Sequence, residues 1–216
     1  MAKQSTFGNM LVVLTVISVI TGALLGYVYN ITKEPIALSK KLKQENAVKE
    51  VAPDFDNSPI EEAYTVTING LDLTVFPAEK EGKKAGAAVQ SKTSIGFGGE
   101  ISVMVGFNAD GTIRNYRVLS HAETPGLGSK MEEWFRTDKG DQSVLGKNPA
   151  TDNLTVKKDG GSVDAITAAT ISSRAFLDAI ANAYAAYTNN DATTSATTQT
   201  GKEASHEYEK TDPQAY

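Results

Sequence analysis

Cysteine is absent from the 216 residues, and histidine occurs at only two positions, His121 and His206. Without cysteine the chain forms no disulfide, has no thiolate nucleophile and cannot hold an iron–sulfur cluster or a zinc ion through sulfur. Two histidines are too few for a histidine-rich metal site. We therefore expect no metal site, and if the protein carries electrons, we expect an organic cofactor to hold them.

An excess of positive charge is also lacking. The chain has 21 basic and 26 acidic residues, which gives a formal net charge of −5 at pH 7. Proteins that bind nucleic acid present a basic face, so we expect no broad nucleic-acid surface. The length allows one ordinary domain with additional segments.

One long run near the N-terminus has no charge at all. Residues Met10–Tyr29 (MLVVLTVISVITGALLGYVY) are uncharged, and a helix needs about 20 apolar residues to cross a bilayer. Tyr27 and Tyr29 suit the membrane interface at one end. A cleaved signal peptide is the alternative, but the run is long for one and no small-residue cleavage site follows it. We expect a transmembrane helix over 10–29, preceded by an N-terminal cap over 1–9.

The charge beside this run does not settle which way the chain crosses the membrane. More lysines follow the run than precede it, which by the positive-inside rule would put the C-terminal part in the cytoplasm. The excess is small, and Glu34 and Glu45 are mixed with it. The lysines are Lys3 before the run and Lys33, Lys40, Lys41 and Lys43 after it.

Residues 30–57 are predicted to form a juxtamembrane helical stalk. Its helix would run from Pro35 to about Val51, with charged residues around a few apolar positions. Pro53 would end the helix, because proline is common just after a helix C-terminus.

Residues 58–187 are predicted to form one α+β domain built on a mostly antiparallel sheet. Asn69-Gly70 between two alternating runs is a strong hairpin signal, and the apolar residues of the last helix recur at a helical interval. Residues 188–216 are polar without apolar periodicity and are predicted to be a disordered tail. The expected strands are 64–68, 71–75, 87–93, 101–107, 113–119, 154–156 and 163–166, and the expected helices are 131–135 and 171–187.

Two glycine-containing loops could hold a cofactor. Ile95–Glu100 (IGFGGE) lacks the spacing of a dinucleotide or P-loop fingerprint, so alone it indicates an ordinary loop. Ser120–Lys130 (SHAETPGLGSK) concentrates polar side chains in an irregular loop, where binding residues often lie. His121 and Glu123 could form an acid–base pair or half of a metal site, or they could belong to a capped loop before the next helix.

Ser162–Arg174 (SVDAITAATISSR) leads from a turn into the last helix and is where we expect the functional site. The hydroxyl of Thr170 could cap that helix. Alternatively, the free N–H groups and the positive end of the helix dipole could receive a phosphate beside the same hydroxyl. The residues of this stretch leave both interpretations open.

Three motifs together resemble the FMN-binding domain family and, more closely, the G subunits of Rnf (Rsx) electron-transport complexes. They are Gly-Phe-Gly-Gly at 96–99, His-x-Glu-Thr-Pro-Gly-Leu-Gly at 121–128 and Asp-x-x-Thr-Ala-Ala-Thr at 164–170, behind one N-terminal span. The resemblance covers almost everything except the polar tail. It implies covalent FMN, attached as a phosphoester to Thr170 by a flavin transferase that recognises Asp164. The implied cofactor site also contains Thr167, Ala168, Ala169, Glu123, Thr124, Leu127 and Gly128.

The third motif departs from the family's usual run at two positions. Ala168 stands where glycine is commoner, and Thr167 replaces the serine of the usual variant. Alanine reaches positive φ less easily than glycine, but we expect small size to be the shared requirement and attachment to proceed. Trp134 and Phe135 are expected in the core or in a subunit contact rather than stacked on the flavin.

The resemblance implies a membrane-anchored FMN carrier that relays electrons within an ion-translocating ferredoxin:NAD+ oxidoreductase, with no complete catalytic site of its own. Its partners would be the membrane and iron–sulfur subunits of that complex. The chain would lie in the inner membrane with its domain on the periplasmic side. One alternative is the C subunit of the Na+-translocating NADH:quinone oxidoreductase, which is similar around the same threonine. The others are a non-redox anchored module in which Thr170 caps the helix, and a stand-alone flavin reductase, for which we find no substrate-binding sequence.

Overall fold

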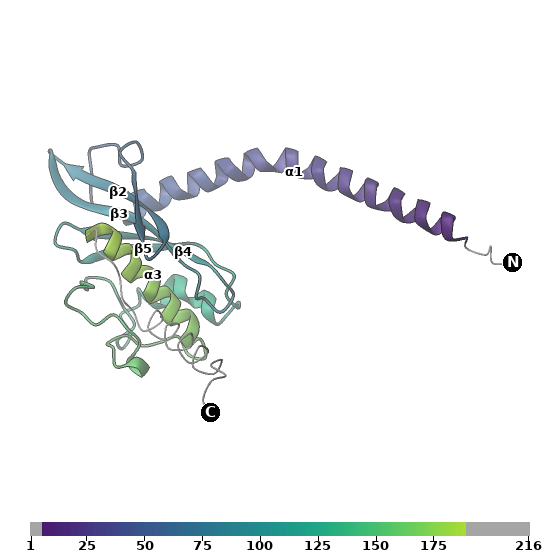
Figure 1. Cartoon of the computed structure of the whole chain (residues 1–216). Helices are drawn as coiled ribbons and strands as arrows, with labels where there is room; N and C mark the ends of the chain where they lie inside the picture. The colour runs from purple at the N-terminus through teal and green to yellow at the C-terminus, as the bar shows by residue number, and fades with distance from the viewer. Residues whose placement is uncertain (1–5, 189–216) are drawn as a thin grey trace, which may run out of the picture. The chain divides into compact units, whose positions relative to one another are not determined.

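The structure, a computed structural model, describes residues 6–188 and divides into two compact units between Gln44 and Glu45. The polar tail predicted over 188–216 lies outside the described residues, apart from Thr188, which ends the last helix. The elements in chain order are α1 (Phe7–Val51), β1 (Tyr64–Ile68), β2 (Leu71–Lys80), β3 (Lys83–Thr93), β4 (Ile101–Asn108), β5 (Ile113–Ser120), α2 (Met131–Trp134) and α3 (Thr170–Thr188) (Figure 1).

The helix α1 is continuous from Phe7 to Val51, where the sequence predicted a membrane span and a separate stalk helix (Figure 1). Pro35 lies inside it and removes one backbone hydrogen bond without ending the helix. An 18-residue window of α1 has a mean hydropathy of 2.4, and none of that window is buried. A helix of this length and composition fits a single-pass membrane anchor.

The second unit is built on a five-stranded antiparallel sheet in the order β1-β2-β3-β4-β5. The hairpin predicted at Asn69-Gly70 is confirmed: both residues have positive φ, 51° and 75°, as a type I′ turn requires. The predicted helix at 171–187 is also confirmed and is one residue longer at each end. The α+β fold predicted from the sequence is therefore correct.

The strands β2 and β3 are longer than predicted because a second tight turn joins them. Glu81 and Gly82 both adopt positive φ, 53° and 69°, and the strands pair on each side of them. Pro77 lies inside β2, but β1 pairs only as far as Val75. Proline is tolerated there because the missing N–H would have faced an unpaired edge.

The strands predicted at 154–156 and 163–166 are wrong. The structure has a single parallel bridge between Val156 and Val163 in place of two strands. Two backbone hydrogen bonds make this bridge, from the Val163 N–H to the Thr155 carbonyl at 3.0 Å and from the Lys157 N–H to the Val163 carbonyl at 2.9 Å. The pairing ends there, because the Asp164 N–H donates to the carbonyl of Asp141 at 2.9 Å instead. Apolar residues in this region are buried by the loops that cross them, which a period-two pattern does not distinguish from a strand.

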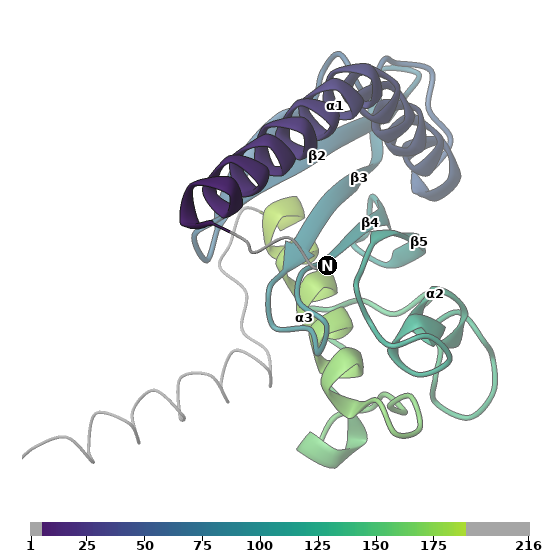
Figure 2. The ribbon, with the colours of Figure 1, turned by 90° about the vertical axis from the view of Figure 1, so that its right-hand side faces the viewer.

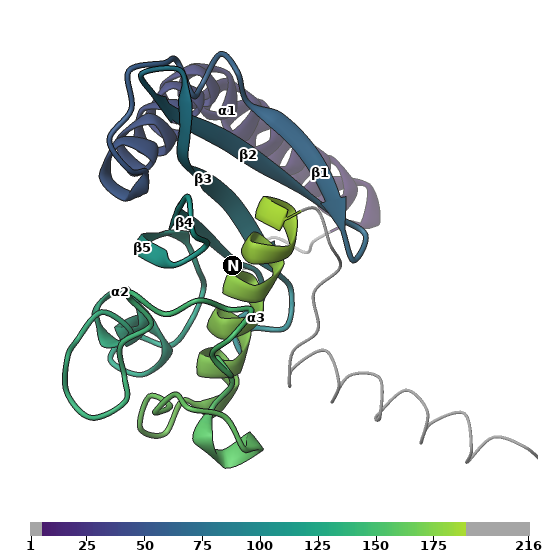
Figure 3. The ribbon, with the colours of Figure 1, turned by 90° about the vertical axis from the view of Figure 1, so that its left-hand side faces the viewer.

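The sheet is covered on both faces, and β4 runs through the middle of the core. Successive side chains of a strand point to opposite faces. Val103 and Phe107 belong to the cluster that α3 buries, whereas Met104 packs with Val48 and Val51 at the end of α1. Figures 2 and 3 show α3 lying along one face of the sheet, beside β3 and β4.

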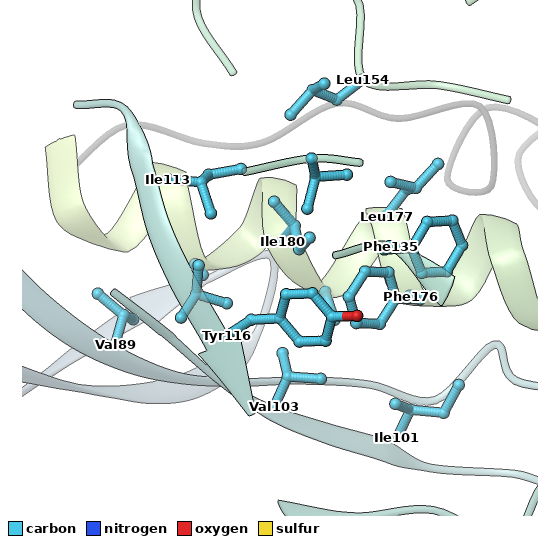
Figure 4. Packing of buried hydrophobic residues seen from close by; sticks show 14 of the residues in the cluster. Val89, Ile101, Val103, Ile113, Tyr116, Phe135, Leu154, Phe176, Leu177 and Ile180 are labelled. Atoms are coloured by element: carbon cyan, nitrogen blue, oxygen red, sulfur yellow. The ribbon is translucent and has the colours of Figure 1, made fainter. Parts of the chain in front are cut away.

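Three aromatic rings fix α3 against the sheet and α2. The ring of Phe176 stacks on Phe135 with centroids 4.5 Å apart and meets Tyr116 edge-on at 4.9 Å. Figure 4 shows these rings among the aliphatic side chains of the core. Phe135 is fully buried, as the sequence predicted. Trp134 is half-buried, and its Nε1–H donates to the carbonyl of Asp164 at 2.9 Å.

The last turn of α1 approaches β4 at a glycine. A Cβ atom on Gly106 would lie 1.9 Å from the carbonyl oxygen of Val51. Any side chain at position 106 would therefore push the end of α1 away from the sheet.

Candidate functional site

Three loops meet at the N-terminal end of α3 and form a pocket of about 330 Å³. Sites for small molecules usually have volumes of about 300–1,000 Å³. Each of the three sequence motifs contributes to the lining, which brings together segments that are far apart along the chain. The lining residues are Phe97, Thr124, Leu127, Gly128, Ala168, Ala169, Thr170, Ile171 and Ser172.

Thr170 is the first residue of α3 and is half-buried in the pocket wall. Among the described residues its hydroxyl has no hydrogen-bond partner, whereas the nearby Ser173 ties the helix start together. The Ser173 hydroxyl accepts from the Ile166 N–H and donates to the Ala169 carbonyl, both at 2.9 Å. The geometry therefore gives no support to Thr170 as the helix cap, and it leaves that hydroxyl available in the pocket.

The first N–H groups of α3 are available at the same place. The first four N–H groups of a helix have no intrahelical carbonyl to bond, and the Ser173 N–H already bonds the Ala169 carbonyl at 3.0 Å. The N–H groups of Thr170, Ile171 and Ser172 remain at the positive end of the helix dipole, which favours an anion.

Ala168 adopts a left-handed conformation, with φ of 61°. It belongs to a tight turn that the Ala169 N–H closes on the Ile166 carbonyl at 3.0 Å. The expectation that only small size matters at this position is therefore incomplete, because the backbone also takes a conformation that glycine adopts freely and other residues adopt at a cost. Ala168 and Ala169 both line the pocket, while Thr167 is exposed beside it and does not.

The 121–128 loop is divided between the pocket wall and the layer behind it. Thr124, Leu127 and Gly128, which the resemblance implied for the cofactor site, line the pocket. Glu123 does not: its side chain is buried behind the wall, at 4% exposure. One carboxylate oxygen of Glu123 accepts from the Gly98 N–H at 2.9 Å, and the other accepts from the hydroxyl of Ser172.

His121 and Glu123 do not form an acid–base pair. The Nδ1 atom of His121 accepts from the backbone N–H of Glu123 at 3.2 Å, and its Nε2 faces a carboxylate oxygen of Glu132 at 3.5 Å. The interpretation as half of a metal site gains no further ligand, since no three acidic or histidine side chains within residues 6–188 could hold a metal ion together.

Phe97 and Ser172 line the pocket, although neither was among the residues that the resemblance implied for the cofactor site. Phe97 is 69% exposed at the tip of the glycine-rich loop and lines the pocket, so that loop is more than the ordinary connection expected from its spacing. An aromatic side chain between glycines was the available signal for Phe97. Ser172 had no signal, because serine in the first turn of a helix is common.

Asp164 lies outside the pocket and is held by an ion-pair cluster. Its carboxylate accepts from the Asp141 N–H at 2.9 Å and pairs with Nζ of Lys157 at 2.8 Å. Lys157 also pairs with the Asp141 carboxylate at 2.6 Å. The hydrogen bond from Lys157, and then that from the Asp141 N–H, lowers the pKa of Asp164 below its usual value.

The sequence matches a family model described as "FMN-binding domain" over residues 96–185. It is 34% identical over 179 residues to the G subunit of the ion-translocating oxidoreductase complex of Erwinia tasmaniensis, covering 78% of this chain and 84% of that protein. The G subunit of the same complex from Aliivibrio fischeri is 32% identical (79% and 85% covered), and that from Stutzerimonas stutzeri is 34% identical (71% and 68% covered). The chain belongs to this family of G subunits. The region matched as an FMN-binding domain contains every residue that lines the pocket.

Proposed function

We propose that this G-subunit chain carries FMN as a phosphoester of Thr170 and relays electrons within an ion-translocating ferredoxin:NAD+ oxidoreductase of the Rnf type. The observation that carries the proposal is the Thr170 hydroxyl, which has no hydrogen-bond partner in the described chain and lies in the pocket wall at the start of α3.

The residues around the pocket fit both parts of FMN. The start of α3 offers N–H groups and a positive dipole end to a phosphate. The rim is apolar, which suits a planar ring system. Among residues 45–188, large apolar side chains are exposed at only five positions, and three of these, Phe97, Leu127 and Ile171, line this pocket. When bound, FMN supplies the electron chemistry, and the protein supplies position and electrostatics.

The covalent bond would serve a carrier whose domain lies outside the cytoplasm. Such a carrier cannot exchange its cofactor with a cytoplasmic pool, and a bond prevents loss even where non-covalent affinity is modest. The α1 helix would hold the chain in the inner membrane, with the domain on the periplasmic side, against the small lysine excess after the span. The membrane and iron–sulfur subunits of the complex would be the electron partners.

Maturation would require a flavin transferase that recognises the segment before Thr170. Asp164 is a suitable recognition residue because its side chain is 34% exposed. Thr167 is also exposed, whereas Ala169 is buried at 8%. The Asp164 carboxylate and the turn at Thr167 are therefore accessible to a transferase, whereas the residue that precedes the helix is not.

The test is the intact mass of the full-length chain produced together with a flavin transferase. We expect a gain of one FMN less one water, with flavin fluorescence that survives a denaturing gel. Thr170→Ala should abolish both signals, and the matched variant Thr65→Ala should keep the fluorescence, because Thr65 is an exposed residue of β1 outside all three motifs. An unmodified mass with an active transferase present would overturn the proposal.

A further inference from the structure

Glu123 is a buried carboxylate that joins the three segments of the pocket. Its own segment is the 121–128 loop, the Gly98 N–H belongs to the glycine-rich loop, and Ser172 belongs to α3. The two hydrogen-bond partners lie 25 and 49 residues away along the chain. A single carboxylate therefore connects three segments that are distant from one another in the sequence.

The glycines of the motifs leave room for this carboxylate. A Cβ atom on Gly96 would lie 2.7 Å from Oε1 of Glu123, and one on Gly128 would lie 2.6 Å from Oε2. A Cβ atom on Gly98 would lie 2.0 Å from the carbonyl oxygen of Ala122, next to Glu123 in the chain. Side chains at these positions would separate the segments that the carboxylate holds together.

Within the described part of the chain, the carboxylate of Glu123 has no cationic partner. None of the ion pairs within residues 6–188 includes it. Both of its oxygens act as acceptors, which is the arrangement of an ionised carboxylate. Gly128 and Ser172 line the pocket and also lie against the carboxylate, so the charge lies directly behind the pocket wall.

We propose that Glu123 is a positioning residue of the pocket: it holds the Gly98 amide and the Ser172 hydroxyl in place, and its negative charge lowers the reduction potential of the flavin. The effect on the potential follows because reduction makes the flavin more electron-rich, which a negative charge in a poorly solvated site opposes. The positioning role stands on the contacts alone, whereas the effect on the potential rests on the proposed function.

The first arm of the test needs no flavin. Amide hydrogen exchange is measured on the full-length chain in detergent, for Glu123→Ala beside Glu133→Ala, which removes an exposed carboxylate from α2. We expect exchange in the peptide covering 94–100, which contains the Gly98 amide, to become about tenfold faster in the Glu123 variant only, the effect of losing a hydrogen bond to a charged group. Unchanged exchange in this peptide would overturn the positioning role.

The second arm compares reduction potentials of the flavin-loaded wild-type chain with those of chains carrying Glu123→Gln or Glu133→Gln. Glutamine keeps the shape of Glu123 and an acceptor for the Gly98 amide, so this variant preserves the pocket while removing the charge. We expect a less negative midpoint potential in Glu123→Gln and an unchanged one in Glu133→Gln. Equal potentials in all three proteins would overturn the electrostatic role. A wild-type chain that accepts no flavin would instead count against the proposed function, and the exchange arm would still decide the positioning role.

Discussion

Replacing Ala168 with glycine should stabilise the domain. Ala168 has φ of 61°, a conformation that costs an L-residue with a side chain about 1–2 kcal/mol. Glycine removes this cost, but it also increases the conformational entropy of the unfolded chain. That increase lowers the free energy of unfolding by about 0.4–1 kcal/mol. Taking the middle of each range, about 1.5 and about 0.7 kcal/mol, the expected net gain is about 0.8 kcal/mol. In a domain of this size that corresponds to a rise in Tm of about 1–4 °C.

The assay is thermal unfolding of the full-length chain in detergent, followed by near-ultraviolet circular dichroism. Ala179→Gly is the matched control, because Ala179 is fully buried inside α3 and does not have positive φ. The same substitution there removes a buried methyl group, worth about 0.8 kcal/mol, and should lower Tm. If Ala168→Gly also lowers Tm, or leaves it unchanged, the left-handed conformation at 168 carries no strain and the reasoning fails.

Two further substitutions test the contacts around the site and the sheet. Lys157→Gln removes the main cause of the lowered pKa of Asp164. A carboxyl group whose pKa is lower in the folded protein stabilises the fold above its unfolded pKa of about 3.9. This contribution to the free energy of unfolding is lost as the pH falls through the pKa of the folded state. The urea midpoint of Lys157→Gln should thus be below that of Lys158→Gln at pH 7, and the difference should shrink as the pH falls below about 3.9. A difference that does not change with pH would contradict this. Gly106→Ala introduces a Cβ atom 1.9 Å from the Val51 carbonyl oxygen and should cost about 1–3 kcal/mol in urea unfolding, as overpacked sites do, so an unchanged midpoint would contradict the close approach.

The elements that the sequence predicted correctly are those whose signals are local. Asn69-Gly70 identifies its turn because both residues favour positive φ, and the helix after Thr170 has a clear apolar period. Glu81-Gly82 makes the same kind of turn, but glutamate has no preference for positive φ, so the extra length of β2 and β3 was not predictable. Pro35 led to the prediction of a separate stalk helix, because proline usually marks a helix boundary, whereas here it lies within the continuous helix α1.

The site was predictable as a set of motifs but not as an arrangement. Thr124, Leu127 and Thr170, which the motifs implied for the cofactor site, line the pocket, and their contact with a cofactor stays a prediction. Residue type alone could not assign Glu123 to the layer behind the wall, nor pair His121 with Glu132 instead of Glu123. The burial of Glu123 and the pairing of His121 depend on how the loops pack against one another. The hydrogen bond between Glu123 and Ser172 joins residues 49 positions apart and leaves no periodic signal in the sequence.

A loop glycine whose φ is not positive can nevertheless indicate that another segment of the chain packs against it. Gly98 does not have positive φ, so its lack of a side chain is explained by the Ala122 carbonyl that a Cβ atom would meet. The same holds for Gly96 and Gly128, which lie against the two oxygens of Glu123. A glycine in an unstrained conformation indicates that another part of the chain must come close, and here two motifs point to one carboxylate. The three glycines and Glu123 therefore form a single packing unit, and a substitution at any of them should disturb the pocket without touching Thr170.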